Sequence, residues 1–200
     1  MNDPLTTALA RGPRVGRPPT FPDADVAYAA HDTVVGRLLL ARLGSTGPLV
    51  ACVYAATADS EEALAERLAR TCSPRVLRLP HVLDDARREI DDYLAGQRHT
   101  IEIAVDLSLA TAFQREVLTT LAARVGYGRR ATYGELAGWV GRPAAARAVG
   151  TALGANPLCI ALPCHRVVGA SGALAGYAGG LPAKEHLLAL ESPGARRALD

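Results

Sequence analysis

The chain has 200 residues, 49% of them hydrophobic, and a net charge of +2, which is enough apolar material for one or two compact domains. Its apolar runs are too short to span a bilayer, and prolines and arginines interrupt residues 1–22, where a secretory signal would be apolar, so we expect a cytoplasmic protein without membrane contact. Residues 59–106 hold 11 acidic and 7 basic side chains, whereas residues 124–200 hold 9 basic and 4 acidic ones. The C-terminal part is therefore better suited to bind phosphates. The alternative is that its arginines only form a solvated surface.

The first part of the chain shows an arm and then a sheet. Residues 1–22 combine prolines and arginines with little apolar periodicity, which predicts a flexible arm. Residues 26–55 alternate β-favouring runs with turn signals, which predicts an antiparallel meander. The pair Asp59 and Glu62 has the spacing of a helix N-terminal cap, so a helix should follow the meander.

Two more elements complete this half. A helical pattern runs over residues 82–94, and the alternation of apolar and polar residues in TIEIAVDL, residues 100–107, predicts another strand. Together these elements predict an α/β domain over residues 23–106.

Two helix starts mark the second half, residues 107–200. Thr111 with Gln114, and Thr132 with Glu135, have the capping-box spacing. The second of these helices is short and is followed, after a glycine turn, by another helical stretch over residues 143–154. Two short helices joined by a tight turn are a helix-turn-helix candidate.

The second helix of this pair carries one long cation, Arg147, among alanines that include Ala146 and Ala148. Small side chains let a helix backbone approach DNA closely, and the arginine could reach into a groove. The alternative is a buried alanine-rich helix with Arg147 in a salt bridge.

The residues with the most distinctive chemistry follow. Residues 159–162, CIAL, suggest a buried strand that Pro163 ends, so Cys164 should lie at a turn facing a pocket. A cysteine is a strong nucleophile only as a thiolate, and His165 is the nearest candidate base, acting through a water or after a backbone turn. A carboxylate should orient this imidazole, and two glutamates near the C-terminus qualify: Glu191, our candidate, and Glu185.

Several motifs in one register carry a family resemblance. They are PCHRV at 163–167, AARAVG at 145–150, NP at 156–157, GYAGG at 176–180 and KEHLLALE at 184–191. In order and spacing, over roughly residues 113–191, the sequence resembles the O6-alkylguanine-DNA alkyltransferase family, also called methylated-DNA–protein-cysteine methyltransferases. The resemblance implies a ribonuclease H-like α/β domain with an antiparallel sheet, then a mostly helical, winged-helix-like DNA-binding domain that holds the helix-turn-helix and the active-site cysteine.

The resemblance also implies roles for single residues. Cys164 would accept the alkyl group, His165 would be the base acting through water, and Glu191 would hydrogen-bond to His165. Asn156 would brace the active-site turn, and Tyr177 would hydrogen-bond the guanine as it leaves. Nothing here could hydrolyse an S-alkyl cysteine, so the enzyme should act once and be consumed.

The implied partner is double-stranded DNA containing O6-alkylguanine, and O4-alkylthymine is included in the expected activity. Arg147 would fill the space left by the flipped nucleotide, and Tyr133 would crowd the neighbouring phosphate. The expected DNA contacts are Gln114, Arg115, Tyr133, Ala146, Arg147, Ala148 and Arg166. The expected pocket residues are Tyr133, Val167, Ala178 and Gly179. We expect a monomer that needs no cofactor.

Other interpretations stay open at this point. No metal-ligand spacing is found among Cys52, Cys72, His31, His81 and His99, so we expect no metal site. We interpret Cys52, Cys72 and Cys159 as core residues. One alternative function is a lesion-binding protein that does not react, although the presence of Cys164 argues against it. A methylation-switched regulator would need a cysteine-rich sensor domain, and a thiol hydrolase would use Cys164 and His165 on an acyl substrate.

Overall fold

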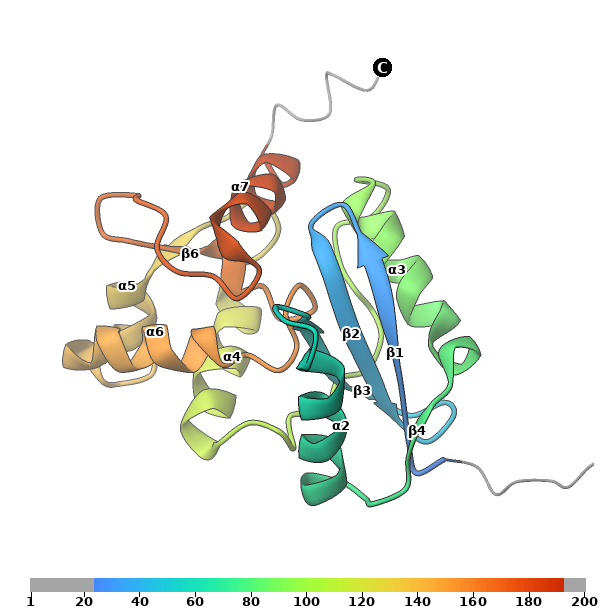
Figure 1. Cartoon of the computed structure of the whole chain (residues 1–200). Helices are drawn as coiled ribbons and strands as arrows, with labels where there is room; N and C mark the ends of the chain where they lie inside the picture. The colour runs from blue at the N-terminus through green and yellow to red at the C-terminus, as the bar shows by residue number, and fades with distance from the viewer. Residues whose placement is uncertain (1–23, 193–200) are drawn as a thin grey trace, which may run out of the picture.

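The computed structural model describes residues 24–192 (Figure 1). The predicted arm at residues 1–22 lies outside this range. No helix within the described residues is long and apolar enough to cross a membrane.

A four-stranded sheet in the order β3-β2-β1-β4 forms the centre of the N-terminal half. β1 (Val26–Thr33), β2 (Gly36–Leu43) and β3 (Leu49–Tyr54) pair antiparallel, which confirms the predicted meander. β4 (Val76–Arg78) adds to β1 in parallel. The sequence did not predict β4, because three residues are too few to show an alternating pattern.

Two helices cover opposite faces of this sheet (Figure 1). Alternate strand residues point to opposite faces. Leu38 and Leu40 therefore pack in the core that contains α3 (Asp84–Leu94), whereas Leu39 packs in the core that contains α2 (Ser60–Thr71). The 3-10 helix η1 (Pro80–Leu83) leads into α3. Both predicted helices are present, although Asp59 makes no side-chain cap.

The strand predicted over residues 100–107 is wrong. This segment touches the free edge of β3 at one point, where Leu49 donates to Ala104 O and accepts from Asp106 N, both at 2.8 Å. Farther along the same edge, Cys52 pairs with the segment from Pro157 to Cys159 through bonds of 2.8 and 2.7 Å. Since two segments share one short edge, neither pairs for long enough to form a strand.

The C-terminal half is mostly helical and lies on the β3 side of the sheet (Figure 1). Both predicted capping boxes form, at Thr111 and at Thr132. The elements are α4 (Ala112–Arg124), β5 (Ala131–Thr132), α5 (Tyr133–Trp139), η2 (Pro143–Ala145), α6 (Ala146–Gly154), η3 (Cys164–Arg166), β6 (Val167–Val168) and α7 (Gly180–Leu190). β5 and β6 pair in parallel, and α6 follows α5 after a turn, as the helix-turn-helix pattern predicts.

The two halves share one hydrophobic core. Its buried residues include Leu40 and Ile90 from the N-terminal half and Leu118, Val149 and Leu187 from the C-terminal half. Burial of this apolar surface is the main force that holds the halves together. A residue of one half can therefore take part in a site of the other.

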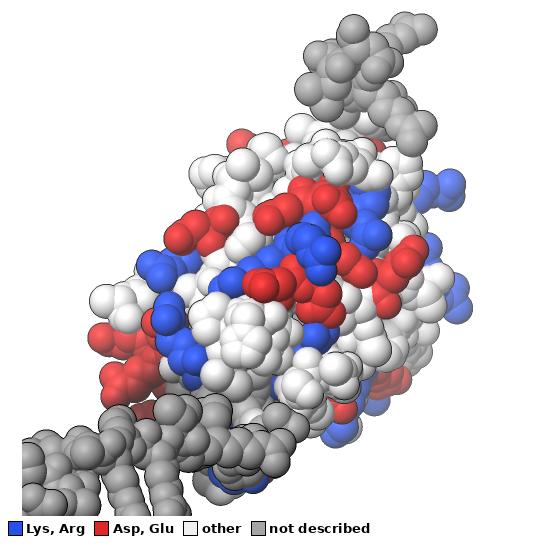
Figure 2. Space-filling model, turned by 90° about the vertical axis from the view of Figure 1, so that its right-hand side faces the viewer, with Lys and Arg blue, Asp and Glu red and all other residues white. Residues whose placement is uncertain are grey.

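The side of the molecule turned toward the reader in Figure 2 mixes both signs of charge. On and beside α3, Asp85 pairs with Arg42 at 2.8 Å and Glu89 pairs with Arg98 at 2.6 Å. Neutralised arginines of this kind offer phosphates no continuous positive surface. This face is therefore poorly suited to DNA.

Candidate active site

The segment before Cys164 is a tight turn, and the strand predicted over residues 159–162 is wrong. Leu162 N donates to Leu158 O at 2.8 Å, and Ala161 N donates to Cys159 O at 2.8 Å. Ile160 between them has φ of 69°, a conformation that is rare for a branched side chain. Most of these apolar residues are buried as expected, but in a turn, whose strain the surrounding contacts must offset.

Asn156 holds this turn and the cysteine together. Its Nδ2 donates to Leu162 O at 3.0 Å and to Cys164 Sγ at 3.1 Å, and its Oδ1 accepts from Leu158 N at 2.9 Å. The side chain is buried, so water does not compete for these bonds. Asn156 therefore ties both ends of the turn to the sulfur atom.

The environment of Cys164 favours the thiolate. The pKa of Cys164 is lowered by hydrogen bonds from the Cys159 thiol and the Asn156 amide and by the positive charge of Lys184, which together outweigh the opposing effect of burial. A lowered pKa increases the fraction of the cysteine that is in its nucleophilic thiolate form. The thiol is only 4% exposed, in contrast to a cysteine that reacts indiscriminately with solutes.

His165 and Glu191 form a fully buried pair. His165 Nε2 lies 2.6 Å from Glu191 Oε1, and since a carboxylate only accepts, this nitrogen carries the proton. Nδ1 is then an unprotonated acceptor, and it is buried without a partner among the described residues. Burial lowers the pKa of His165, against the opposing effect of Glu191, so the ring is neutral and able to accept a proton. Glu185, the other candidate, is exposed.

The Glu191 carboxylate accepts hydrogen bonds from three parts of the chain. Besides His165, it accepts from Arg166 Nε at 2.9 Å, from Gly128 N at 3.1 Å and from the Tyr93 hydroxyl. Burial alone would raise the pKa of Glu191, but the bonds from His165 and Arg166 dominate and bring it down to about 2. The carboxylate is therefore charged at every physiological pH.

The expectation that Arg166 contacts DNA is wrong. Its side chain is buried, with Nε on Glu191, one amino group on Val125 O at 2.7 Å and the guanidinium over the Tyr127 ring. A guanidinium with its donors satisfied internally is not available to phosphate. The presence of an arginine in the PCHRV motif is explained by its ion pair with Glu191, in which its positive charge stabilises the buried carboxylate.

The two tyrosines expected at the substrate both lie near Cys164. The Tyr133 ring packs on α6, where an added Cβ at Gly150 would be 3.6 Å from it. The Tyr177 ring lies edge-on to His165, 6.4 Å between centroids. Burial raises the pKa of both hydroxyls, and the Cys164 charge raises them further, so both stay neutral donors.

The remaining pocket residues differ in exposure. Val167 is buried, Gly179 is half-buried and Ala178 is exposed, so the loop before α7 is the accessible part of the expected pocket.

Two residues that support this site were not predicted from the sequence. Lys184 is fully buried and donates to Val167 O at 2.7 Å and to Ala175 O at 2.8 Å, which joins the start of β6 to the loop before α7. A lysine inside the otherwise apolar face of α7 could have signalled this role. No sequence pattern pointed to Tyr93, because it lies on α3 in the N-terminal half, far along the chain from the motifs that mark the site.

The expected DNA contacts other than Arg166 lie on or near α6. Arg147 is exposed and makes no ion pair with any residue in 24–192, so it is not in the buried salt bridge that was the alternative for it. A groove of about 280 Å³ between α4 and α6 is lined by Gln114 and Ala148 among others. Gln114 already accepts from Thr111 N in the capping box, which leaves its amide nitrogen for a partner, and Arg115 beside it is exposed.

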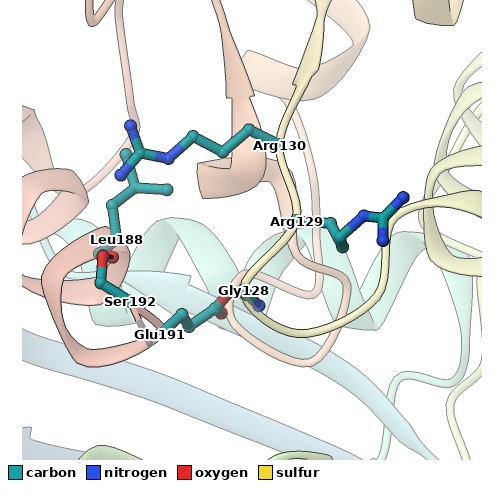
Figure 3. Close-up of a pocket in the computed structure, with 6 residues that line it drawn as sticks. All are labelled: Gly128, Arg129, Arg130, Leu188, Glu191 and Ser192. Atoms are coloured by element: carbon teal, nitrogen blue, oxygen red, sulfur yellow. Dashed lines mark hydrogen bonds between the residues drawn. The ribbon is translucent and has the colours of Figure 1, made fainter. Parts of the chain in front are cut away.

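A second cavity, of about 240 Å³, lies behind the Glu191 carboxylate (Figure 3). It is lined by Gly128, Arg129, Arg130, Leu188, Glu191 and Ser192. Arg130 extends toward Leu188, whereas Arg129 points away from it. Cys164 does not line this cavity, so it is separate from the nucleophile. Among the described residues, no three His, Cys, Asp or Glu side chains come together as a metal site would require.

Known proteins share this architecture and its motifs. A family model described as "6-O-methylguanine DNA methyltransferase, DNA binding domain" matches residues 112–193. The methylated-DNA–protein-cysteine methyltransferase of Mycolicibacterium paratuberculosis is 47% identical over 112 residues, 56% of this chain and 67% of that one. The Salmonella typhimurium protein of the same name is 50% identical over 100 residues, half of this chain, and the match spans only 58% of its length.

The likeness extends to the whole fold. The crystal structure of the O6-methylguanine methyltransferase of Mycobacterium tuberculosis is 35% identical, with a TM-score of 0.70 over 88% of this chain and 99% of that one. A structure of the same organism's protein in complex with DNA gives a TM-score of 0.69 at 34% identity. With the buried Cys164, His165 and Glu191 in one site, the chain belongs to the methylated-DNA–protein-cysteine methyltransferase family.

Proposed function

We propose that this protein repairs alkylated DNA by direct reversal, moving the alkyl group from O6 of guanine to Cys164 in a single turnover. The observation that carries the proposal is the buried Cys164 sulfur, held by Asn156 next to the neutral His165 and its Glu191 partner. DNA is the partner, and the specific substrate is a duplex with O6-alkylguanine. The related protein from M. tuberculosis, which has been crystallised with DNA, supports this proposal.

The proposed reaction is a displacement at the alkyl carbon. His165 Nδ1 removes the Cys164 proton through a bridging water, and Glu191 stabilises the resulting imidazolium. The thiolate forms a bond to the alkyl carbon as the carbon–O6 bond breaks, and the electron pair stays on guanine. Tyr177 donates to the base as that charge develops. The thioether has no hydrolytic partner in the site, so the protein is consumed.

The base must leave the duplex to reach this sulfur. Rotating it out costs a few kcal/mol, and an inserted side chain stabilises the gap. Arg147 is the exposed cation of α6 suited to that task, with Tyr133 beside the flanking phosphate. The small side chains of Ala146 and Ala148 would let the helix approach the minor groove closely.

The direct test uses intact-protein and peptide mass spectrometry after mixing the protein with a duplex that holds one O6-methylguanine. The expected product carries one methyl group on the peptide containing Cys164, and the yield saturates at one per molecule. Binding of the lesion without modification would instead support a recognition-only protein. Turnover of an acyl substrate without DNA would support a thiol hydrolase.

Replacing Arg147 by alanine is expected to slow repair of duplex DNA by about 10²-fold, since the flipped state loses roughly 3 kcal/mol of stabilisation. The free base O6-benzylguanine needs no flipping, so its reaction with the variant should match that of the wild type. Rates on both substrates are measured by single-turnover quench. Equal slowing on both would contradict the role in flipping.

We also propose that the sheet half has the ribonuclease H-like arrangement and that β5, β6 and the helices around them form a winged-helix-like unit. We expect the protein to act as a monomer in the cytoplasm. Sedimentation of the free protein and of its complex with a duplex tests the oligomeric state.

A further inference from the structure

Tyr54 ends β3 in the N-terminal half, outside all the motifs that mark the site. Its hydroxyl lies 3.3 Å from the Tyr177 hydroxyl, close enough for a hydrogen bond in which either can donate. The two rings are edge-on, 5.5 Å between centroids at 73°. A residue of the sheet therefore touches the tyrosine that we propose binds the base.

The same ring lies directly on the loop before α7. A Cβ added at Gly179 would come within 2.5 Å of Cε1 and 2.8 Å of Cε2 of Tyr54, distances that real Cβ atoms do not reach. Tyr54 thus occupies the space that a side chain at Gly179 would fill. A Cβ at Gly36, the first residue of β2, would lie 3.7 Å from the ring, an ordinary van der Waals distance, so the ring also packs beside the start of β2.

Tyr54 also lies close enough to Cys164 for the two side chains to interact electrostatically. Burial raises the pKa of Tyr54, and among the smaller effects the charge of a Cys164 thiolate raises it as well. The same charge acts on Tyr177. Both tyrosines pack against the hydrophobic core that contains Cys164, which is itself only 4% exposed.

We propose that Tyr54 determines the size of the alkyl group this protein accepts, with its ring forming a wall of the base pocket against Gly179 and Tyr177. The proposal rests on the proposed function. A methyl group leaves the wall in place, whereas a benzyl group needs space that the ring occupies. Repulsion in a closely packed pocket discriminates against the larger group.

The test compares Tyr54→Ala with the wild type on two duplexes, one with O6-methylguanine and one with O6-benzylguanine. The ratio of the benzyl rate to the methyl rate is expected to rise by about tenfold in Tyr54→Ala. A change of this size is within the range of rate ratios that a change in pocket volume usually produces. Tyr54→Phe keeps the ring and loses only the hydroxyl, so its ratio should stay within about twofold of the wild type. Tyr28→Ala, a half-buried tyrosine in the core on the other face of the sheet, controls for general loosening.

The outcomes separate cleanly. If the wild type transfers no methyl group, the proposed function fails. If it does, and folded Tyr54→Ala keeps the wild-type ratio, only the role of Tyr54 is overturned, and an equal rise in Tyr28→Ala overturns it too. Should Tyr54→Ala not fold, Tyr54→Leu keeps apolar packing while vacating the far end of the ring, and an unchanged ratio there also overturns the proposal.

Discussion

Replacing Cys164 by alanine is expected to abolish alkyl transfer completely and to leave binding to the duplex intact. The variant lacks the sulfur that Asn156 Nδ2 holds, and the alanine methyl group offers no nucleophile in its place. The helix-turn-helix surface, including exposed Arg147, is untouched by the change. Mass spectrometry after incubation with O6-methylguanine duplex should show unmodified protein, while a gel-shift assay shows lesion binding at wild-type affinity.

The matched control is Cys72→Ala. Cys72 is half-buried, its thiol lies near the Ser108 hydroxyl, and it packs in the core on the other face of the sheet, so this variant should transfer the methyl group at the wild-type rate. A methylated product from Cys164→Ala would mean that another thiol is the acceptor. Buried Cys159, in the same turn, would then be the first to examine by peptide mapping.

The second large effect concerns Glu191. In Glu191→Gln the imidazole loses its negatively charged acceptor and the buried guanidinium of Arg166 loses its counter-ion, so we expect transfer to slow by about 10²–10³-fold. Breaking such a buried pair typically costs about 3–5 kcal/mol of unfolding free energy. Single-turnover kinetics and urea unfolding measure the two losses. Glu185→Gln, on the exposed side of α7, should change neither.

The same carboxylate predicts a pH dependence. The folded pKa of Glu191 is about 2, below its ordinary value, so its contribution to stability is present above the unfolded pKa and is lost as the pH falls from about 4 toward 2. The wild type should lose stability over that range faster than Glu191→Gln. If Glu191→Gln does not fold, Tyr93→Phe removes one donor to the carboxylate and should cost about 1–2 kcal/mol. If the variant that folds keeps the pH profile of the wild type, the role of the carboxylate is contradicted.

Local signals in the sequence were enough for much of this protein. The capping boxes at Thr111 and Thr132, the meander over residues 26–55 and the helix pair around Arg147 all depend on neighbours within a few residues, which is why the sequence alone predicts them. The motif register also identified the family and named Cys164, His165 and Glu191, which the fold brings together.

Only the tertiary structure decided what depends on distant contacts. The strands expected at residues 100–107 and 159–162 had the right hydrophobicity, but the first segment makes a single bridge to the edge of β3. The second closes into a turn through its own backbone hydrogen bonds, directly after Leu158 bridges to Cys52. Arg166 became an internal partner of Glu191 because burial favours satisfying its charge inside. Tyr93 and Tyr54 reach the site from the other half of the chain, and the sequence by itself could not place them, because periodicity records which residues are buried and not which distant residue they meet.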